Sequence, residues 1–442
     1  MPQKKETLRE LRTSLVSRGF RLAKASLKAG GLSATQWLSG DATQKPGWVQ
    51  QMESLVVELG QLKGTAMKVG QTLSMYGEHL LPKEVNELLK NLQQNSPAVR
   101  WEAMHARLLE ELGPERLAAL EIDPVAVASA SIGQVYRGSI KATGQPIAIK
   151  VQYPGVDLAI ETDLKLLKFI LNVSGLIPRG PRFDQIFEEI RAMFYQEINY
   201  HQERESGEFF ARLLAHDVRY IVPKVFPEFS TRKVLTTEFI EGHRADSEAV
   251  QALSPERRNH LGRAFLELYL HELMQAKKVQ TDPHLGNYMV QVDPEGRDRL
   301  VLLDFGAVRE VPTEFLLSYA HLMEGGLNKD KRLIEKGGRL LNLLLAEDPI
   351  ELVDDYIDLC MALMEPFEEG EYDWANNDLP QRVAGKASKI AFSYKLRAPP
   401  RELVFLDRKL GGVFIFLSVL KCKMASRAIL FDHLAAHSPL RK

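Results

Sequence analysis

Two short motifs in the second half of the chain carry side chains suited to phosphoryl transfer. Asp282 is followed by Asn287 after four intervening residues, and the tripeptide Asp304-Phe-Gly lies further downstream. Phosphoryl transfer needs metal ions that neutralise the phosphates and a carboxylate that positions or deprotonates the acceptor. Protein kinases supply these groups in this order. The pattern therefore predicts Asp282 as the catalytic base or water-positioning group, and Asn287 and Asp304 as metal ligands. Carboxylates on surface turns are the alternative.

A lysine on a short apolar segment is the second candidate. In the run Ile147–Val151 three apolar side chains alternate with other residues, so a strand would place them on one face and Lys150 on the other. Taken alone, such a lysine fits equally well as a solubility device on an edge strand. Together with the two motifs it matches the kinase lysine that holds the α- and β-phosphates and is oriented by a helix carboxylate. Candidate partners are Glu197 and Glu203, on the predicted helix 183–214.

The segment before Lys150 is where a kinase would carry a Gly-rich phosphate loop, and here small residues replace most of the glycines. Glycine permits positive φ and close approach of the backbone to phosphate, whereas alanine restricts both. We therefore expect a stiffer loop that holds the nucleotide differently, with a packed small-residue turn as the alternative. The predicted nucleotide-binding residues are Ala128, Ser129, Ala130, Ser131, Lys150 and Glu238.

Four further segments occur in an order known from one family. They are residues 68–71 (Lys-Val-Gly-Gln), residues 128–135 around the small-residue loop, residues 148–155 around Lys150, and residues 281–287. They resemble the KxGQ signature, the Ala-rich loop, the lysine strand and the catalytic loop of the UbiB/AarF family. These are atypical kinase-like proteins associated with ubiquinone biosynthesis. The resemblance covers roughly residues 55–430, and residues 406–412 are similar to the mitochondrial coenzyme Q members.

The resemblance implies an α+β, bilobal protein-kinase-like fold preceded by a helical extension that carries the KxGQ motif. It pairs Lys150 with Glu203, and it pairs Lys68 with Glu197 of the family's ExD motif. Gln71 would lie beside Lys68, so that the extension covers the cleft where a peptide kinase admits its substrate. Lys68, Gln71 and Glu197 are accordingly predicted to be regulatory.

The chain departs from the family and from typical kinases at three points. Asn199 replaces the aspartate of the ExD motif, which keeps hydrogen-bonding capacity but removes a charge that would help to hold Lys68. The kinase His-Arg-Asp is Gln-Thr-Asp at residues 280–282, and no Ala-Pro-Glu follows the Asp-Phe-Gly. A typical Ser/Thr/Tyr protein kinase is therefore not expected.

Composition narrows the class of protein. The chain has 442 residues, a hydrophobic content of 45% and a formal net charge of −1. A general nucleic-acid binder normally carries a strong basic excess, so we expect no nucleic-acid partner. The two cysteines, Cys360 and Cys422, form no CxxC pair. Neither a disulfide framework nor a zinc site is expected, and a reducing compartment is the simpler interpretation.

Charge is concentrated near the N-terminus. Residues 1–30 contain eight Lys or Arg and two acidic residues, and residues 6–30 are predicted to form a basic amphipathic helix. A solvated helix and a membrane-surface anchor are both compatible with this pattern, and the family resemblance favours the membrane. Basic residues interrupt every apolar run, which predicts no secretory signal. The late apolar stretch 411–420 is too short for a membrane span. We expect a cytoplasmic protein, peripheral at the inner face of the membrane.

The expected elements follow from periodicity and turn residues. Helices are predicted at 52–73, 83–92, 101–112, 155–173 and 183–214, and strands at 128–137, 145–152, 233–239, 288–292 and 300–303. The predicted domains are a basic segment and linker (1–50), a helical KxGQ extension (51–123), a kinase-like N-lobe (124–240) and a kinase-like C-lobe (241–442).

These observations lead to one leading hypothesis of function. It is an atypical kinase or ATPase of the UbiB type with ATP and Mg²⁺ as cofactors, which supports ubiquinone or other prenyl-lipid metabolism at the membrane. The expected partners are nucleotide, a prenylated quinone precursor, anionic membrane and quinone-biosynthesis proteins. The main alternative is a nucleotide-gated scaffold or a chaperone-like lipid-binding protein with incidental catalysis. The third hypothesis is a small-molecule kinase of the aminoglycoside phosphotransferase type. The KxGQ segment argues against it.

Overall fold

The structure, a computed structural model, describes residues 99–129, 132–157, 194–394 and 399–441, with a few single positions between 161 and 192. The described residues fall into two compact units. The first comprises those up to Arg204 together with Val225–Phe239, and the second comprises Glu205–Lys224 and the residues from Ile240 onward. The predicted basic segment, the KxGQ helices and most of the predicted helix 155–173 lie outside the described residues.

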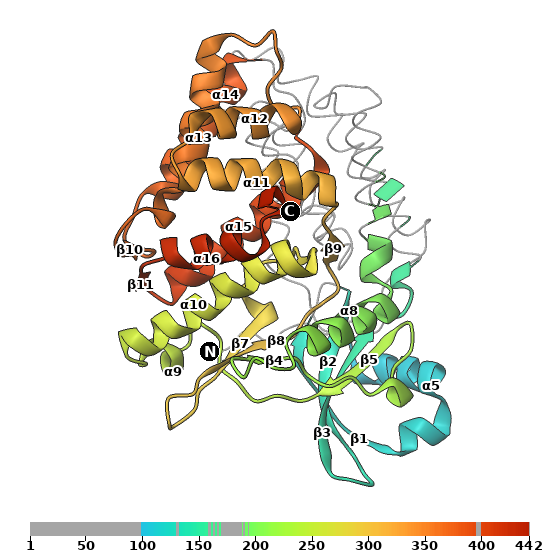
Figure 1. The fold of residues 1–442 in the computed structure, drawn as a ribbon. Helices are drawn as coiled ribbons and strands as arrows, with labels where there is room; N and C mark the ends of the chain where they lie inside the picture. Colours follow the sequence, from blue (N-terminus) through green and yellow to red (C-terminus); the bar gives the residue numbers. More distant parts are fainter. Residues whose placement is uncertain are drawn as a thin grey trace, which may run out of the picture. The chain divides into compact units, whose positions relative to one another are not determined.

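The first unit is built around a four-stranded antiparallel sheet with the strand order β1-β2-β3-β5 (Figure 1). Its strands are β1 (Leu120–Ser129), β2 (Gly133–Ile140), β3 (Gln145–Gln152) and β5 (Val234–Glu238). The helix α5 (Trp101–Ala118) packs its buried Met104 and Leu108 in the same apolar cluster as the sheet. The alternation predicted for β3 is confirmed, because Ile147, Ile149 and Val151 are fully buried and Lys150 is half-buried.

Two elements of this unit differ from the sequence-based expectation. The strand β1 begins at Leu120 and runs through Pro124, with register shifts in its pairing between Ile122 and Ala128. Proline is tolerated there because β1 lies at the edge of the sheet and the irregular pairing spares a ladder hydrogen bond. The helix α5 continues past the predicted end at Leu112, across a kink at Gly113, whose φ of 75° requires glycine.

The second unit is mainly helical and carries two small sheets close to the predicted motifs (Figure 1). In one sheet β8 (Arg299–Leu302) pairs antiparallel with β7 (Tyr288–Gln291) and parallel with β4 (Tyr220–Ile221). In the other, β6 (Lys278–Gln280) pairs antiparallel with β9 (Val308–Glu310). The strands β10 (Tyr372–Asp373) and β11 (Lys423–Met424) form a further short pair. The helices are α9 (Glu248–Gln251), α10 (Pro255–His271), α11 (Thr313–Leu327), α12 (Lys331–Leu340), α13 (Ile350–Leu363), α14 (Leu379–Ser393), α15 (Arg401–Val419) and α16 (Arg427–His437).

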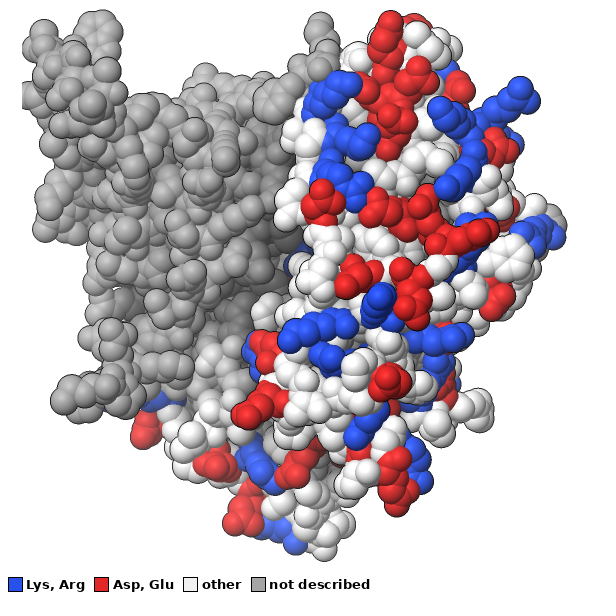
Figure 2. Space-filling view, turned by 90° about the vertical axis from the view of Figure 1, so that its left-hand side faces the viewer, with Lys and Arg blue, Asp and Glu red and all other residues white. Residues whose placement is uncertain are grey.

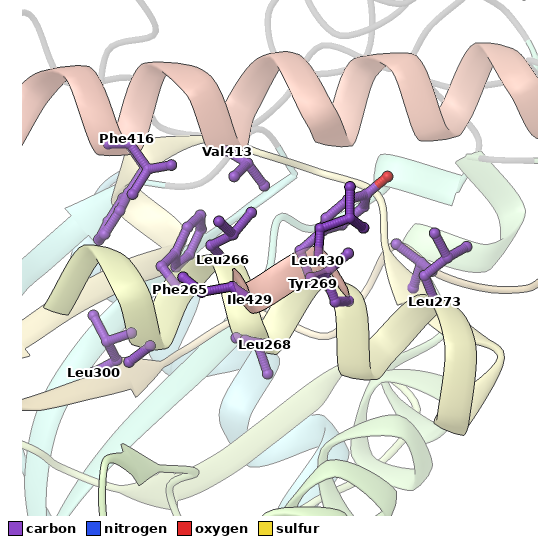
Figure 3. Close-up of a cluster of buried hydrophobic side chains, with 14 of the residues drawn as sticks. Phe265, Leu266, Leu268, Tyr269, Leu273, Leu300, Val413, Phe416, Ile429 and Leu430 are labelled. Atoms are coloured by element: carbon purple, nitrogen blue, oxygen red, sulfur yellow. The ribbon is translucent and has the colours of Figure 1, made fainter. Parts of the chain in front are cut away.

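The core of the second unit forms where α10 meets α15 and α16. Figure 3 shows Phe265 and Leu266 of α10 close to Val413 and Phe416 of α15. The rings of Phe265 and Phe416 are stacked, with centroids 4.0 Å apart. Because α15 packs directly on α10, its polar residues must find partners inside the protein or at its surface.

The helix α8 (Tyr200–Leu213) contributes to both units. It begins in the first unit, but residues 205–224 belong to the second, where Phe210 is buried in the core. The burial of apolar side chains, and not the position along the chain, decides to which unit such a segment belongs.

Charged side chains are interspersed on the described part of the face shown in Figure 2, where Lys and Arg alternate with Asp and Glu. This mixed distribution agrees with the formal net charge of −1. In the described part of the chain, no helix combines the length and the apolar character that a membrane span needs.

Candidate active site

The pairing of two hairpin strands places the candidate metal ligands beside one another. Tyr288 of β7 lies opposite Leu302 of β8, and the backbone N–H of Leu303 donates to the carbonyl of Asn287 at 3.0 Å. Asn287 therefore ends the catalytic-loop segment at the point where Asp304 begins the Asp-Phe-Gly tripeptide. This register follows from alternating apolar residues on two short strands, which fixes the facing pairs.

A buried glutamine connects the two motifs. The Gln280 side chain accepts a hydrogen bond from the backbone N–H of Asp282 at 2.7 Å and donates to the carbonyl of Asp304 at 3.1 Å. The neighbouring Thr281 donates through both its backbone N–H and its hydroxyl to the carbonyl of Ala307. In the sequence, Gln280 is recognisable only as the replacement of the kinase histidine. The structure shows that its amide, with one donor and one acceptor end, holds both motifs in one geometry.

Both carboxylate oxygens of Asp282 accept hydrogen bonds. Arg408 of α15 donates to Oδ1 at 2.7 Å, and the Asn287 amide donates to Oδ2 at 3.2 Å and to the Asp282 carbonyl at 3.0 Å. Arg408 was missed by sequence reasoning, although it lies in the stretch 406–412 that resembles the coenzyme Q members. The arrangement holds the carboxylate in one orientation and compensates its charge, as expected for a charge-assisted hydrogen bond.

The oxygen atoms near Asn287 and Asp304 fit a magnesium ion. The Asn287 amide nitrogen donates to Asp282, so the oxygen Oδ1 is the atom of this side chain that could bind a cation. The Asp304 Oδ1 accepts from the N–H of Gly306 at 2.9 Å, which orients that carboxylate. Within the described residues no three His, Cys, Asp or Glu side chains cluster as a metal cage. Mg²⁺ is suited to such a sparse oxygen set, since it keeps several waters and shares its coordination with substrate phosphates.

In the first unit, Lys150 and Glu203 form an ion pair. The Lys150 Nζ lies 2.7 Å and 2.9 Å from the two carboxylate oxygens, with the side chains 18% and 4% exposed. The ring of Tyr200 lies beneath the ammonium, with its centroid 5.2 Å from Nζ. Tyr200 begins α8, and its backbone N–H donates to the carbonyl of Arg232 just before β5. That contact sets the first turn of α8 against the sheet, so Glu203 faces Lys150.

A family model described as the ABC1 atypical kinase-like domain matches residues 91–337, which is more than half of the chain. The chain belongs to this family. The resemblance to the UbiB/AarF family and the predicted kinase-like α+β fold are thereby confirmed.

Relatives of this ABC1 kinase-like chain include proteins named as mitochondrial atypical kinases. It is 29% identical to "Atypical kinase COQ8, mitochondrial" of Saccharomyces cerevisiae, over 93% of this chain and 84% of the relative. It is 32% identical to "Atypical kinase COQ8B, mitochondrial" of Rattus norvegicus, over 86% of this chain and 71% of the relative. Two other such relatives are longer, and the chain spans 60% and 49% of their length. A solved structure of Rv3197 with erythromycin from Mycobacterium tuberculosis is 26% identical, with a TM-score of 0.59 over 86% of this chain and 94% of that one.

The remaining predicted site residues of this ABC1 kinase-like chain lie at strand ends, just before α8, or outside the described residues. Ala128 and Ser129 end β1 and are exposed, and Glu238 lies opposite Ile147 at the end of β5. Glu197 is half-buried just before α8. Outside the described residues lie Lys68, Gln71, Ala130 and Ser131.

Two further polar residues, Gln134 and Asn199, lie close to the Ala-rich loop and to α8. The buried Gln134 accepts from the backbone N–H of Val99 at 2.8 Å, so it anchors the entrance to α5. The carbonyl of Asn199 accepts from the N–H of Gln202 at the start of α8. The Asn199 side-chain oxygen is buried, and within the described part of the chain it has no hydrogen-bond partner. The change from aspartate thus leaves a buried acceptor in place of a charge.

Proposed function

We propose that this chain is an atypical kinase or ATPase that binds ATP with Mg²⁺ and hydrolyses it or transfers its terminal phosphoryl group. The observation that supports the proposal is the Leu303–Asn287 hydrogen bond, since it brings the backbone at Asn287 next to the start of the Asp-Phe-Gly tripeptide, while the Asn287 amide donates to Asp282. The family model and the names of the relatives support a kinase-type activity.

Each residue has a proposed task that its contacts make physically reasonable. Asn287 and Asp304 would hold Mg²⁺, which when bound neutralises charge on the phosphates. Asp282, oriented by Arg408, would position the attacking water or acceptor hydroxyl. In the first unit Lys150 would bind the α- and β-phosphates, with Glu203 fixing the direction of the ammonium. Ala128 and Ser129 would contribute the edge of the phosphate loop.

The proposed setting is prenyl-lipid metabolism. Relatives named COQ8 motivate a role in ubiquinone or related pathways, with a prenylated quinone precursor and quinone-biosynthesis proteins as partners. The basic segment 1–30 motivates attachment to an anionic membrane surface, where each basic residue contributes on the order of 1 kcal/mol. We place the protein at the inner face of such a membrane.

One observation favours a nucleotide-gated scaffold as the second candidate. The Asp282 carboxylate is already engaged on both oxygens, by Arg408 and by the Asn287 amide. A protein that uses nucleotide binding mainly to change conformation needs no strong base at this position.

ATP turnover in the presence of lipid tests the proposal. The full chain is incubated with ATP and Mg²⁺, with or without anionic liposomes that contain a prenylphenol, and phosphate release is measured alongside ATP binding. We expect turnover that requires Mg²⁺ and rises with the liposomes. Tight ATP binding with no turnover under any of these conditions would favour the scaffold.

Arg408 is expected to be a positioning residue for turnover. Because phosphoryl transfer depends mainly on positioning, Arg408→Ala should lower kcat by about tenfold or more and leave the KM for ATP within about twofold. Arg408→Lys should recover part of the loss, since it restores a cation near Asp282 but not the planar guanidinium. Arg401→Ala, at the start of the same helix, serves as the control. If Arg401→Ala lowers kcat by the same factor, the loss in Arg408→Ala would be due to a destabilised helix and not to the contact with Asp282.

A further inference from the structure

The second unit contains an apolar cavity apart from the candidate active-site residues. It has a volume of about 150 Å³ and is bounded by residues of α10, α11, α13, α15 and α16. Tyr269 and Leu430, both labelled in Figure 3, line it from α10 and α16. An apolar cavity of this size accommodates a benzene-sized ring.

Among the described residues that line the cavity, Asp407 is the one with a charged side chain. Asp407 has an exposed side of its surface and also borders the cavity. Within the described residues, no lysine or arginine lines the cavity with it.

The basic residues next to Asp407 in the sequence are committed elsewhere. Arg408 donates to Asp282, and the buried Lys409 lies 3.2 Å from Glu272 and 3.1 Å from the hydroxyl of Tyr288. Successive residues of a helix point in different directions, so neither cation can turn to Asp407 without breaking its own contact. Within the described residues, neither neighbouring cation therefore pairs with Asp407 in the cavity lining.

The cavity wall adds a second feature that suits a cation. Tyr269, Tyr319 and Tyr356 all line it, and aromatic faces attract an ammonium group while they pack against apolar groups. Burial raises the pKa of Tyr269, Tyr319 and Cys360, so these lining groups stay neutral near pH 8.

We propose that this cavity binds a small lipophilic amine, whose ammonium group pairs with Asp407 and whose ring or branched apolar body fills the space between Tyr269, Tyr356 and Leu363. The complementarity is of charge, because the acid lacks a cation, and of surface, because nearly all other lining residues are apolar or aromatic. The site is independent of the proposed nucleotide chemistry and needs neither ATP nor Mg²⁺.

Calorimetric titration of the full chain at pH 8 tests the proposal, with 4-phenylbutylamine as the probe and 4-phenylbutanol as its uncharged counterpart. We expect the amine to bind wild type at least tenfold more tightly than the alcohol. Asp407→Asn should remove this preference and leave the affinity for the alcohol within about twofold. The control is Asp432→Asn, an exposed acid on α16 that does not line the cavity, and it should bind both probes like wild type.

A second variant keeps the test decisive if Asp407→Asn does not fold. Leu363→Trp adds volume to the half-buried cavity wall and should abolish binding of both probes. Equal affinity of wild type for the amine and the alcohol would overturn the proposal. Undiminished amine binding by folded Asp407→Asn or by folded Leu363→Trp would overturn it as well, since binding would then occur elsewhere.

Discussion

The Asp304→Asn variant is expected to lose Mg²⁺-dependent ATP turnover by at least ~10²-fold while it stays folded, a loss of the size that follows removal of one electrostatic group from an active site. Asparagine has the same shape and keeps an oxygen that can accept from the N–H of Gly306, as Oδ1 does now at 2.9 Å. What it loses is the negative charge with which Asp304 would hold the metal ion. Phosphate release at saturating ATP, measured with and without Mg²⁺, checks the expectation.

The matched control for this variant is Asp293→Asn. Asp293 also accepts the N–H of the residue two positions on, at 2.6 Å to Glu295, but it lies in the loop that joins β7 and β8. The two substitutions thus change the same kind of turn, and the control should retain full turnover. Undiminished turnover in a folded Asp304→Asn protein would remove Asp304 from the proposed metal site.

Replacement of Lys150 by methionine is expected to weaken ATP binding by about tenfold or more, as loss of a charge-assisted contact to phosphate should. It should also lower the free energy of unfolding by roughly 2–4 kcal/mol, because Glu203, only 4% exposed, would lose its cation. Affinity for adenosine should hardly change, since adenosine lacks the phosphates that Lys150 would contact. Titrations with ATP and adenosine, together with denaturant unfolding, measure the three quantities.

Lys233→Met separates the local role of Lys150 from a general effect of charge. Lys233 lies just before β5 and forms longer contacts, 3.8 Å to Asp157 and 4.0 Å to Glu111, which should contribute at most about 1 kcal/mol. The Lys233→Met variant should therefore bind ATP like wild type. If Lys150→Met lowers stability but binds ATP as tightly as Lys233→Met does, the ion pair is structural and the phosphates contact other residues.

Local patterns were sufficient for much of the first unit and for the motif segments. The strand predicted at 145–152 has those bounds in the structure, and the strands predicted around Tyr288 and Leu300 form the β7–β8 hairpin. Alternation of apolar and polar residues encodes such strands directly, because successive side chains face opposite sides. The four segments at 68–71, 128–135, 148–155 and 281–287 were likewise sufficient to predict the family, which the ABC1 match confirms.

Other features were decided by contacts between residues far apart in the chain. The predicted helix 183–214 gives way at residues 198–199, and α8 starts at Tyr200, whose N–H is taken by the carbonyl of Arg232. Arg408 reaches Asp282 across 126 positions, and no spacing in the sequence relates the two. The same helix places Asp407 beside an apolar cavity, whose other walls come from α10, α11, α13 and α16. Periodicity reports which side chains share a face, but the partner of that face is set when the helices pack and their polar groups must be satisfied.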